Sequence, residues 1–389
     1  MASSSDAALA QPSSEMRQGL PQSGPLIVLL SCKEVETSLL KGSSEKYGGS
    51  GNDEGFLWKA LESLDTDFSR VSWNEPGLLG QLQSRSEHSL KTLVVCRTTW
   101  DYCDSPSVLS QFLELVLAVE ALPFCSLLNS ASMLKWNTHK QYLAQLQEAG
   151  VSIIPTRILE PGAGEPATVA SLGEQLDTPH GLVLKPAVSN SACGVFLLED
   201  NSDADAAAVM DAYLSAAFSG SSDTASLATG VGPARWSGEA EVLLAQPFQP
   251  GIREFGELSV MVLGGEVTHA VVKRPAAGSG DFKVQEEYGG VETRVHPPAE
   301  TLAMAKAVVR TSAAIAGGAL PGDASSAEGG LEGVAIARVD FVRLGEGLEP
   351  GSLALMEVEC VEPSLFFKYA PEAADTLAAY LSKCLQEVQ

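Results

Sequence analysis

Three carboxylates in the last fifth of the chain have a spacing that could bind a metal ion. Asp340 lies in the apolar segment 335–342, and Glu357 and Glu359 lie two residues apart in the apolar segment 353–361. Residues two apart in a strand project from the same face. Carboxylates in such strands are costly unless cations or a divalent metal neutralise them. Oxygen ligands suit Mg²⁺ or Mn²⁺ that bridges phosphates. The alternative is an exposed sheet edge with solvated carboxylates.

A hairpin that precedes these strands presents further polar side chains. Its two strands, 258–263 and 266–272, flank Gly264-Gly265, which is typical of a two-residue turn. Regular pairing from this turn places apolar side chains on one face of the hairpin. The opposite face then holds Glu257, Ser259, Thr268 and, at its open end, Arg274.

Two residues of the hairpin are predicted to face the core. His269 falls on the apolar face, which favours a hydrogen-bonded core histidine over a catalytic base. Lys273 points to the same side, so we expect it to be a weaker site candidate than Arg274. The Gly-bounded loop 280–290 follows and holds Lys283, and loops of this kind are often lids.

Two lysines and a loop of small residues could hold an anion. The spacing of residues 138–150 predicts a helix with Lys140 in its first turn, beside free backbone N–H groups. Lys185 ends the predicted strand 182–185 and leads into the loop 187–193, whose backbone N–H groups could bind phosphates. The alternatives are a surface lysine and a plain surface hairpin.

The N-terminal part alternates strands with helices. Strands over 26–31, 70–73 and 92–96 and helices over 54–64 and 110–121 predict a small parallel α/β domain at about residues 25–127. Ligands bind at the carboxyl ends of parallel strands, and four candidate substrate residues follow the last of them. The alternative is a packed strand end with a surface arginine. These candidates are Arg97, Trp100, Asp101 and Tyr102.

The composition excludes two classes of partner. The 389 residues include 25 Lys and Arg against 49 Asp and Glu, a formal net charge of −24. Nucleic acids and anionic membrane surfaces require clustered cations, so we expect neither as a partner. No apolar run reaches the roughly 20 residues that span a bilayer. Seven scattered cysteines favour reduced thiols in the cytoplasm.

Residues 1–24 are predicted to form a disordered tail. Arg17 is the one basic residue among them, and they contain no apolar segment typical of a secretory signal. A plastid or mitochondrial transit peptide is the alternative, and it would change the expected compartment.

The order of the segments resembles the ATP-grasp superfamily, in its glutathione-synthetase-like branch, which includes the cycloserine-forming cyclo-ligase. Short nucleotide-binding motifs such as GxxxxGK[ST] are absent, so any ATP site has another architecture. The resembling segments span nearly all of residues 90–370 in the family's order. They are 98–102, 127–156, 182–195, 242–250, 256–290, 337–342 and 355–367.

The resemblance implies an α/β fold of three parts. The small parallel domain at 25–127 precedes two ATP-grasp lobes, 128–250 and 251–389, whose antiparallel sheets enclose the nucleotide. It also implies a ligase that uses ATP and Mg²⁺ to join a small carboxylate to an amine through an acyl phosphate. A homodimer stays open. The alternatives are an ATP-binding sensor or scaffold and a small-molecule kinase.

The resemblance also implies roles for single residues. Lys140 and Lys185 match the lysines that reach the phosphates. The phosphate-covering loop would use Ser189, Ser191 and Gly194. The adenine hinge matches Gln246, Pro247 and Phe248, and Glu257 matches the acidic residue near the ribose. Arg274 and Lys283 match cations near the transferred phosphate, and the metal ligands match Asp340, Glu357 and Glu359.

Three features depart from the family pattern. The phosphate loop keeps Gly194 alone where relatives are usually richer in glycine. Glutathione synthetases usually have Asn at the position of Glu359 and Arg at the position of Ser259, which argues against glutathione as the product. The segments 201–239 and 317–333 are longer than usual.

Overall fold

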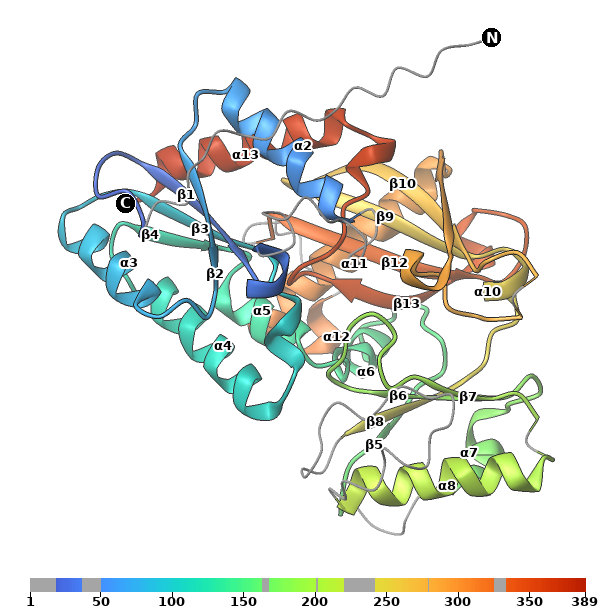
Figure 1. Ribbon diagram of the computed structural model, residues 1–389. Coiled ribbons are helices and arrows are strands. Elements are labelled where there is room, and N and C mark those ends of the chain that lie inside the picture. The colour runs from blue at the N-terminus through green and yellow to red at the C-terminus, as the bar shows by residue number, and fades with distance from the viewer. Residues whose placement is uncertain are drawn as a thin grey trace.

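The computed structural model describes residues 19–36, 50–162, 168–200, 202–219, 242–278, 280–324 and 334–389. They form three sheets, one parallel and two antiparallel (Figure 1). The predicted α/β class, with a parallel N-terminal sheet and antiparallel sheets in the two following lobes, is confirmed. Within the described ranges, no helix has the length and apolar character needed to cross a membrane.

The N-terminal sheet has the parallel order β2-β1-β3-β4. Its strands are β1 (Leu26–Ser31), β2 (Phe68–Ser72), β3 (Thr92–Thr98) and β4 (Cys125–Leu128). Helices cover both faces, which explains why β1 and β3 are buried along their whole length. On one face lie α3 (Leu78–Glu87) and α4 (Pro106–Glu120), and on the other α2 (Ser50–Ser63) and the C-terminal α13 (Glu372–Glu387).

The start of the ordered chain differs from the predicted tail. Leu20 is buried against the α3 side of the N-terminal sheet, and its N–H donates to Gln81 at 2.6 Å. The folded chain therefore begins before residue 25. Residues 1–18 lie outside the described ranges.

The central sheet has the antiparallel order β11-β10-β9-β12-β13. One of its faces packs against α11 (Ala299–Ala316), while the opposite face carries the predicted carboxylates. The strands are β9 (Glu257–Leu263), β10 (Glu266–Arg274), β11 (Val291–Val295), β12 (Ile336–Arg343) and β13 (Leu353–Glu359). Short helices α10 (Gly251–Glu254) and α12 (Pro321–Ala324) flank this lobe.

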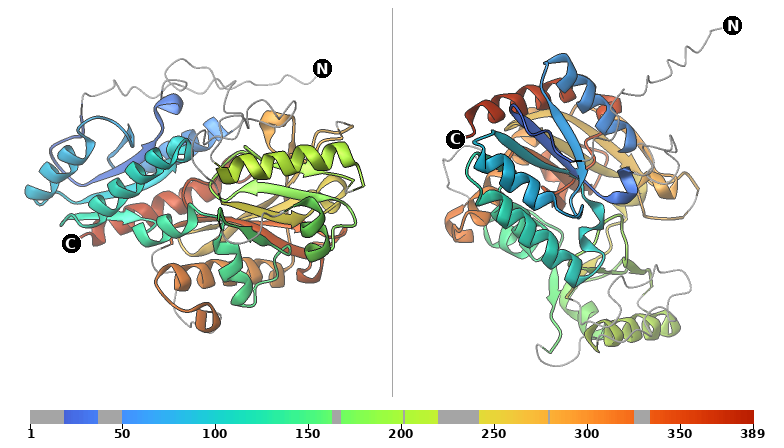
Figure 2. Two further views of the ribbon diagram at one scale, coloured as in Figure 1. Left: turned by 90° about the horizontal axis from the view of Figure 1, so that it is seen from below. Right: turned by 60° about the vertical axis from the view of Figure 1, so that its left-hand side comes forward.

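The third sheet projects from the rest of the molecule with the order β5-β8-β6-β7 (Figures 1 and 2). Helices α7 (Val169–Leu176) and α8 (Ala204–Ser219) cover one face of it, and α8 confirms the helix predicted at about 204–218. The strands are β5 (Arg157–Leu159), β6 (Leu182–Pro186), β7 (Phe196–Leu198) and β8 (Leu243–Pro247). The two segments predicted to be longer than usual are 201–239 and 317–333. Of these, residues 220–239 and 325–333 lie outside the described ranges.

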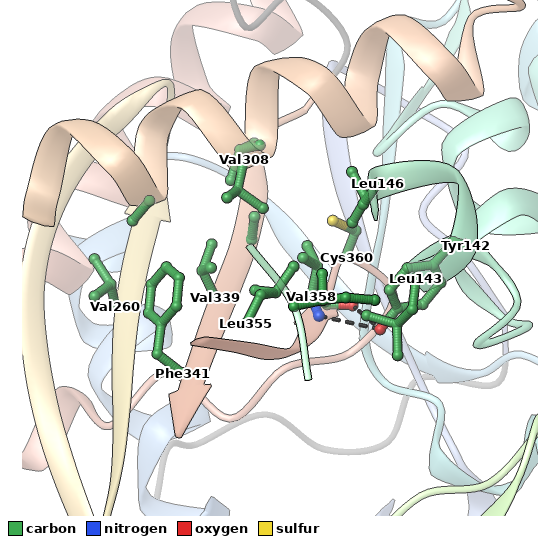
Figure 3. Close-up of a cluster of buried hydrophobic side chains, with 14 of the residues drawn as sticks. Tyr142, Leu143, Leu146, Val260, Val308, Val339, Phe341, Leu355, Val358 and Cys360 are labelled. Carbon is green, nitrogen blue, oxygen red and sulfur yellow. Dashed lines mark hydrogen bonds between the residues drawn. The ribbon is translucent and has the colours of Figure 1, made fainter. Parts of the chain in front are cut away.

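Residues 129–154, which the prediction assigns to the lobe at 128–250, pack mainly against the central sheet, and Lys140 also donates from its backbone to the Ala187 carbonyl of the projecting lobe. Asn129 donates to the carbonyls of Ile336 and Cys360 at 2.7 and 2.6 Å. Tyr142 Oη donates to the Val358 carbonyl at 3.0 Å, and its ring joins the apolar cluster beneath β12 and β13 (Figure 3). The projecting lobe therefore begins at β5.

The helix predicted over 138–149 is shorter than expected. It is reduced to α6 (Tyr142–Glu148), and a separate helix, α5 (Ala131–Asn137), precedes it with a turn between the two. Thr138 Oγ1 donates to the Lys135 carbonyl at 2.9 Å instead of capping α6. Lys140 therefore lies before α6 and not in a first helical turn, while Gly150 ends the segment with φ of 86°, as expected.

Candidate active site

A cavity of about 410 Å³ lies between the central sheet, the projecting lobe and the short η1 helix (Trp100–Cys103) of the N-terminal domain. Three of the predicted site residues, Arg97, Gly194 and Arg274, do not line it. The predicted residues that do line it are Trp100, Asp101, Tyr102, Lys140, Lys185, Ser189, Ser191, Gln246, Pro247, Phe248, Glu257, Lys283, Asp340, Glu357 and Glu359.

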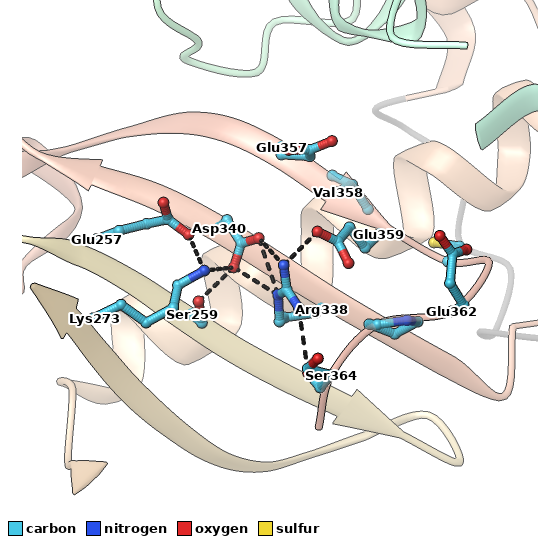
Figure 4. A network of polar contacts seen from close by, with 12 residues as sticks. Glu257, Ser259, Lys273, Arg338, Asp340, Glu357, Val358, Glu359, Glu362 and Ser364 are labelled. Atoms are coloured by element: carbon cyan, nitrogen blue, oxygen red, sulfur yellow. Dashed lines mark hydrogen bonds and ion pairs between the residues drawn. The ribbon is translucent and has the colours of Figure 1, made fainter. Parts of the chain in front are cut away.

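The carboxylates meet on one face of the central sheet, as the strand alternation predicts. Asp340 lies opposite Ser259 on β9 and opposite Glu357 on β13. Ser259 Oγ donates to Asp340 at 2.5 Å. Glu359 lies one pair further along β13, opposite Arg338 (Figure 4). Cross-strand register therefore gathers side chains that are up to 100 residues apart in the sequence.

The predicted pairing of the β9–β10 hairpin is right at the turn and wrong beyond it. Leu263 lies opposite Glu266 as expected, but the register shifts between Val267 and His269. One extra residue in a strand moves the later side chains to the other face. His269 is buried, with a ring nitrogen 2.7 Å from the Leu365 carbonyl, so the core histidine is confirmed.

This shift exchanges the predicted positions of Lys273 and Arg274. Lys273 pairs with Glu257 across the strands, and its ammonium forms an ion pair with the Glu257 carboxylate and lies 3.8 Å from Asp340. Burial alone would lower the pKa of Lys273, but Asp340 and Glu257 outweigh it and raise that pKa. Arg274 is exposed and points away from the cavity-lining face. Lys273 is thus a site residue that regular alternation missed.

Arg338 lies between two of the carboxylates (Figure 4). Its guanidinium donates to Asp340 at 2.8 to 3.0 Å and forms an ion pair with Glu359. Burial opposes the charge on Asp340, but Arg338 and Lys273 outweigh it and lower the pKa of Asp340. Arg338 and Asp340 are two residues apart in β12 and therefore share a face, and the ion pair with Glu359 makes Arg338 a bridge from β12 to β13.

The three predicted metal ligands are held by cations in this arrangement. Arg338 contacts Asp340 and Glu359, and Lys140 Nζ lies 3.2 Å from Glu357. As they stand, no three His, Cys, Asp or Glu side chains of the described residues are placed to hold a metal ion. Burial, with repulsion from Glu357 and Asp340, raises the pKa of Glu359 to about 7 despite Arg338. This excess of negative charge and the oxygen-only donors fit a divalent cation, provided that Lys140 or Arg338 moves.

Lys185 is a buried cation without a counter-ion. It precedes the last residue of β6 and is 8% exposed, and its ammonium group has no hydrogen bond or ion pair in the part of the chain that the structure describes. Burial lowers the pKa of Lys185 to about 8. An ammonium group buried in this way requires an anion, because its desolvation is otherwise uncompensated.

The loop after Lys185 has a backbone suited to an anion. Ser191 and Ala192 have φ of 47° and 53°, and Gly194 has φ of 74°. Successive residues of this kind can turn backbone N–H groups into a concave anion site. A Cβ on Gly194 would lie 2.7 Å from Pro186 Cγ, so packing explains why glycine remains there.

Lys140 ties this loop to the central sheet. Its Nζ donates to the Ser189 carbonyl at 2.5 Å, and its backbone N–H donates to the Ala187 carbonyl at 2.7 Å. The same ammonium reaches Glu357 on β13. A lysine that precedes α6 therefore connects both walls of the cavity, as the two-lobe expectation requires.

The predicted adenine hinge, Gln246 to Phe248, lines the cavity, but one of its backbone N–H groups already donates to another part of the protein. The Phe248 N–H donates to the Gly181 carbonyl at 2.9 Å. By strand alternation the Pro247 carbonyl then faces the other edge of β8. Pairing of β5 with β8 ends at Ala245, so this edge is open beside Pro247.

The N-terminal candidates divide into structural and cavity-facing groups. Arg97 is buried and forms an ion pair with Glu54 at 2.9 Å, which contradicts a surface or substrate-facing arginine. Asp101 lines the cavity, but its carboxylate accepts from Trp73 Nε1 at 2.5 Å. Trp100 and Tyr102 also line the cavity. The cavity has a further lining residue that sequence reasoning missed, Glu362, because it follows β13 in a loop without strand periodicity.

The chain is similar in sequence to one curated protein, the cycloserine biosynthesis protein DcsG of Streptomyces lavendulae. The two are 26% identical over 294 residues, which cover 75% of this chain and 83% of that protein. No family model matches the chain.

Solved structures share the fold. The crystal structure of D-cycloserine synthetase DcsG has a TM-score of 0.65 at 19% identity and covers 92% of this chain and 99% of its own. D-alanine–D-alanine ligase from Bacillus anthracis has a TM-score of 0.53 at 16% identity, with 94% and 97% covered. The ATP-grasp ligase PsnB, complexed with a minimal precursor, has a TM-score of 0.50 at 14% identity, with 92% and 100% covered.

Proposed function

Because the chain has the ATP-grasp fold and resembles D-cycloserine synthetase, we propose that it is an ATP- and Mg²⁺-dependent carboxylate–amine ligase. Its substrate is a small amino-acid-like molecule. A substrate carboxylate oxygen attacks the γ-phosphorus, and ADP leaves. The amine nitrogen then attacks the acyl carbon, the bond from that carbon to the phosphate oxygen breaks, and inorganic phosphate leaves with the electron pair.

The observation that carries this proposal is Lys185. A buried ammonium without a counter-ion lies at the start of a loop whose backbone can bind an anion. A polyphosphate is the anion that suits both features, because it offers several oxygens to one ammonium and to successive N–H groups.

The other residues divide the remaining tasks. Lys140 and Lys273 add positive charge from the opposite wall, where it offsets charge that develops on the transferring phosphoryl group. The Pro247 carbonyl accepts from Gln249 Nε2 at 3.4 Å, and its second lone pair can accept a hydrogen bond from the adenine amino group, while Gln246 and Phe248 line the same wall. By the family resemblance we assign Glu257 to the ribose and Lys283 to the acyl acceptor. Since no protein nucleophile takes part, positioning and electrostatics supply the catalysis.

Asp340, Glu357 and Glu359 are the residues that would hold Mg²⁺. Bound Mg²⁺ supplies positive charge that neutralises the phosphates. We expect Lys140 or Arg338 to release its carboxylate when the ion binds.

A phosphate-release screen tests the function. The full chain is incubated with ATP, Mg²⁺ and pairs of small carboxylates and amines, and we expect phosphate only when a carboxylate is present. Hydroxylamine should then trap the acyl phosphate as a hydroxamate. Lys185→Met should reduce both the affinity for ATP and phosphate release at least tenfold, whereas Lys306→Met, at a half-buried lysine paired with Glu266 away from the cavity, should match the wild type.

Two results would contradict the ligase. Binding of ATP without phosphate release for any pair would indicate a sensor or scaffold. A stable phosphate ester without hydroxamate would indicate a kinase. The screen therefore separates the three functions by their products.

A further inference from the structure

Glu362 is a buried carboxyl group that the proposed mechanism leaves without a task. It follows β13, is 8% exposed and lines the cavity. Its side chain has no hydrogen bond or ion pair among the described residues, although buried polar groups are nearly always paired. A buried carboxyl group that faces a cavity and has no partner in the protein points to a ligand.

The neighbouring cations are already engaged. Lys140 contacts Glu357, and Arg338 contacts Asp340 and Glu359. Lys140 and Arg338 do favour the charged form of Glu362, but burial and repulsion from Glu359 raise the pKa of Glu362 to about 8. The Glu362 carboxyl group therefore has no paired cation among the described residues, just as the Lys185 ammonium on the other wall has no paired anion among them.

Tyr102 supplies a second buried polar group in the same place. It is 5% exposed and lines the cavity, and its ring stacks on Phe112 with centroids 5.1 Å apart. Its hydroxyl has no hydrogen-bond partner within the described ranges. Tyr102 and Glu362 line the same cavity, and after burial the charge of Glu362 is the largest influence that raises the pKa of Tyr102.

The backbone holds these two residues together. Trp100 Nε1 donates to the Glu362 backbone carbonyl at 3.4 Å, and Trp100 and Tyr102 lie in the same η1 helix. The Phe112 stack fixes the ring of Tyr102 from behind. The pair is therefore organised before a ligand arrives, and both side chains lie at the N-terminal end of the cavity.

We propose that Glu362 and Tyr102 form the subsite for a substrate amino group, so that the amine substrate is a small amino acid that binds as an ammonium ion and gives one proton to the Glu362 carboxylate before its nitrogen attacks. This inference rests on the proposed ligase function, which defines the amine as the substrate that attacks the acyl phosphate. An ammonium group offers three N–H donors, of which the carboxylate and the phenol oxygen accept two. A neutral hydroxyl in the same position supplies no positive charge, so Glu362 keeps its proton, whereas an ammonium ion stabilises the ionised carboxylate.

Isothermal titration of the full chain, saturated with Mg·ADP, tests this subsite without turnover. The probes are glycine, D-alanine and D-serine, each matched with the acid that carries a hydroxyl in place of the amine: glycolate, D-lactate and D-glycerate. We expect at least one amino acid to bind at least tenfold more tightly than its hydroxy acid. Glu362→Gln should reduce this preference at least tenfold and Tyr102→Phe about threefold, with the affinity for ADP unchanged.

The control removes a different carboxylate from the same cavity. Glu286→Gln acts on an exposed residue that pairs with Lys368 at 3.4 Å, and it should change the preference less than twofold. Should Glu362→Gln fail to fold, as judged by thermal unfolding, Tyr102→Phe decides. The proposal is overturned if no probe amino acid binds, if hydroxy acids bind equally well, or if the variants keep the preference. An intact amino preference without phosphate release would reject the ligase and leave the subsite standing.

Discussion

Lys273 and Arg274 are neighbours in the sequence, yet they lie in opposite environments. Lys273 is buried between Glu257 and Asp340, whereas Arg274 is exposed. A cation between two buried carboxylates holds them in place and positions positive charge beside the site that we propose for the phosphates. A single bulge in β10 decides which of the two residues has this role.

At this scale we predict opposite outcomes for the two cations. Lys273→Met should lower phosphate release at least a hundredfold and reduce the free energy of unfolding by about 3–5 kcal/mol, because it leaves buried carboxylates unpaired. Arg274→Met should keep both values close to those of the wild type. Phosphate-release kinetics and urea unfolding measure the two effects. A larger loss in Arg274→Met than in Lys273→Met would contradict the bulge and support the regular register.

Among the elements, α2 organises the loop that follows β13. The Asp53 carboxylate accepts hydrogen bonds from the backbone N–H groups of Leu365, Phe366 and Phe367 at 2.7 to 2.8 Å. Phe366 has φ of 53°, which this set of hydrogen bonds helps to maintain. Through three backbone contacts, a helix of the N-terminal domain thus fixes the segment that carries Glu362.

We therefore predict that Asp53→Asn weakens the fold at this element. An amide keeps one acceptor oxygen and points two donors at backbone donors, so the free energy of unfolding should fall by about 1–3 kcal/mol. Hydrogen exchange of residues 365–367 should accelerate. Glu62→Gln, at an exposed position of the same helix, is the matched control and should change neither value. Unchanged exchange in Asp53→Asn would contradict the anchoring role.

Over the whole molecule, charge is distributed unevenly. The chain carries a net charge of −24, but Lys140, Lys185, Lys273 and Arg338 are buried around one cavity. The overall acidity therefore excludes a polyanion on the surface and permits a nucleotide inside. The net charge of the chain therefore does not predict which ligands the cavity binds.

His269 should make the stability of the whole fold depend on pH. Burial lowers the pKa of His269 to about 4, below its value of about 6.5 in the unfolded chain. Between these values the unfolded state binds more protons, so stability is present above pH 6.5 and is lost as pH falls towards 4. His269→Gln lacks this titration, so the wild type should lose about 2–3 kcal/mol relative to it between pH 6.5 and pH 4.5. Urea unfolding at both pH values measures this, and parallel losses in the two proteins would contradict it.

Local periodicity predicted much of the site. Alternation in two apolar strands was enough to place Asp340, Glu357 and Glu359 on one face, because a period of two depends on the backbone of each strand alone. The ends of β6 and β8 placed Lys185 and Gln246 in the same way. The class of the fold followed from the order of strands and helices.

The tertiary structure decided what local periodicity does not contain. The bulge that exchanges Lys273 for Arg274 depends on contacts from outside the hairpin, among them the hydrogen bond of His269 to Leu365, almost a hundred residues away. Glu362 lies in a loop, so no repeat marks it, and its lack of a cation is visible only once Lys140 and Arg338 are seen to be engaged elsewhere. Strand alternation therefore determined which residue types could meet, and long-range packing determined which charges remain for a ligand.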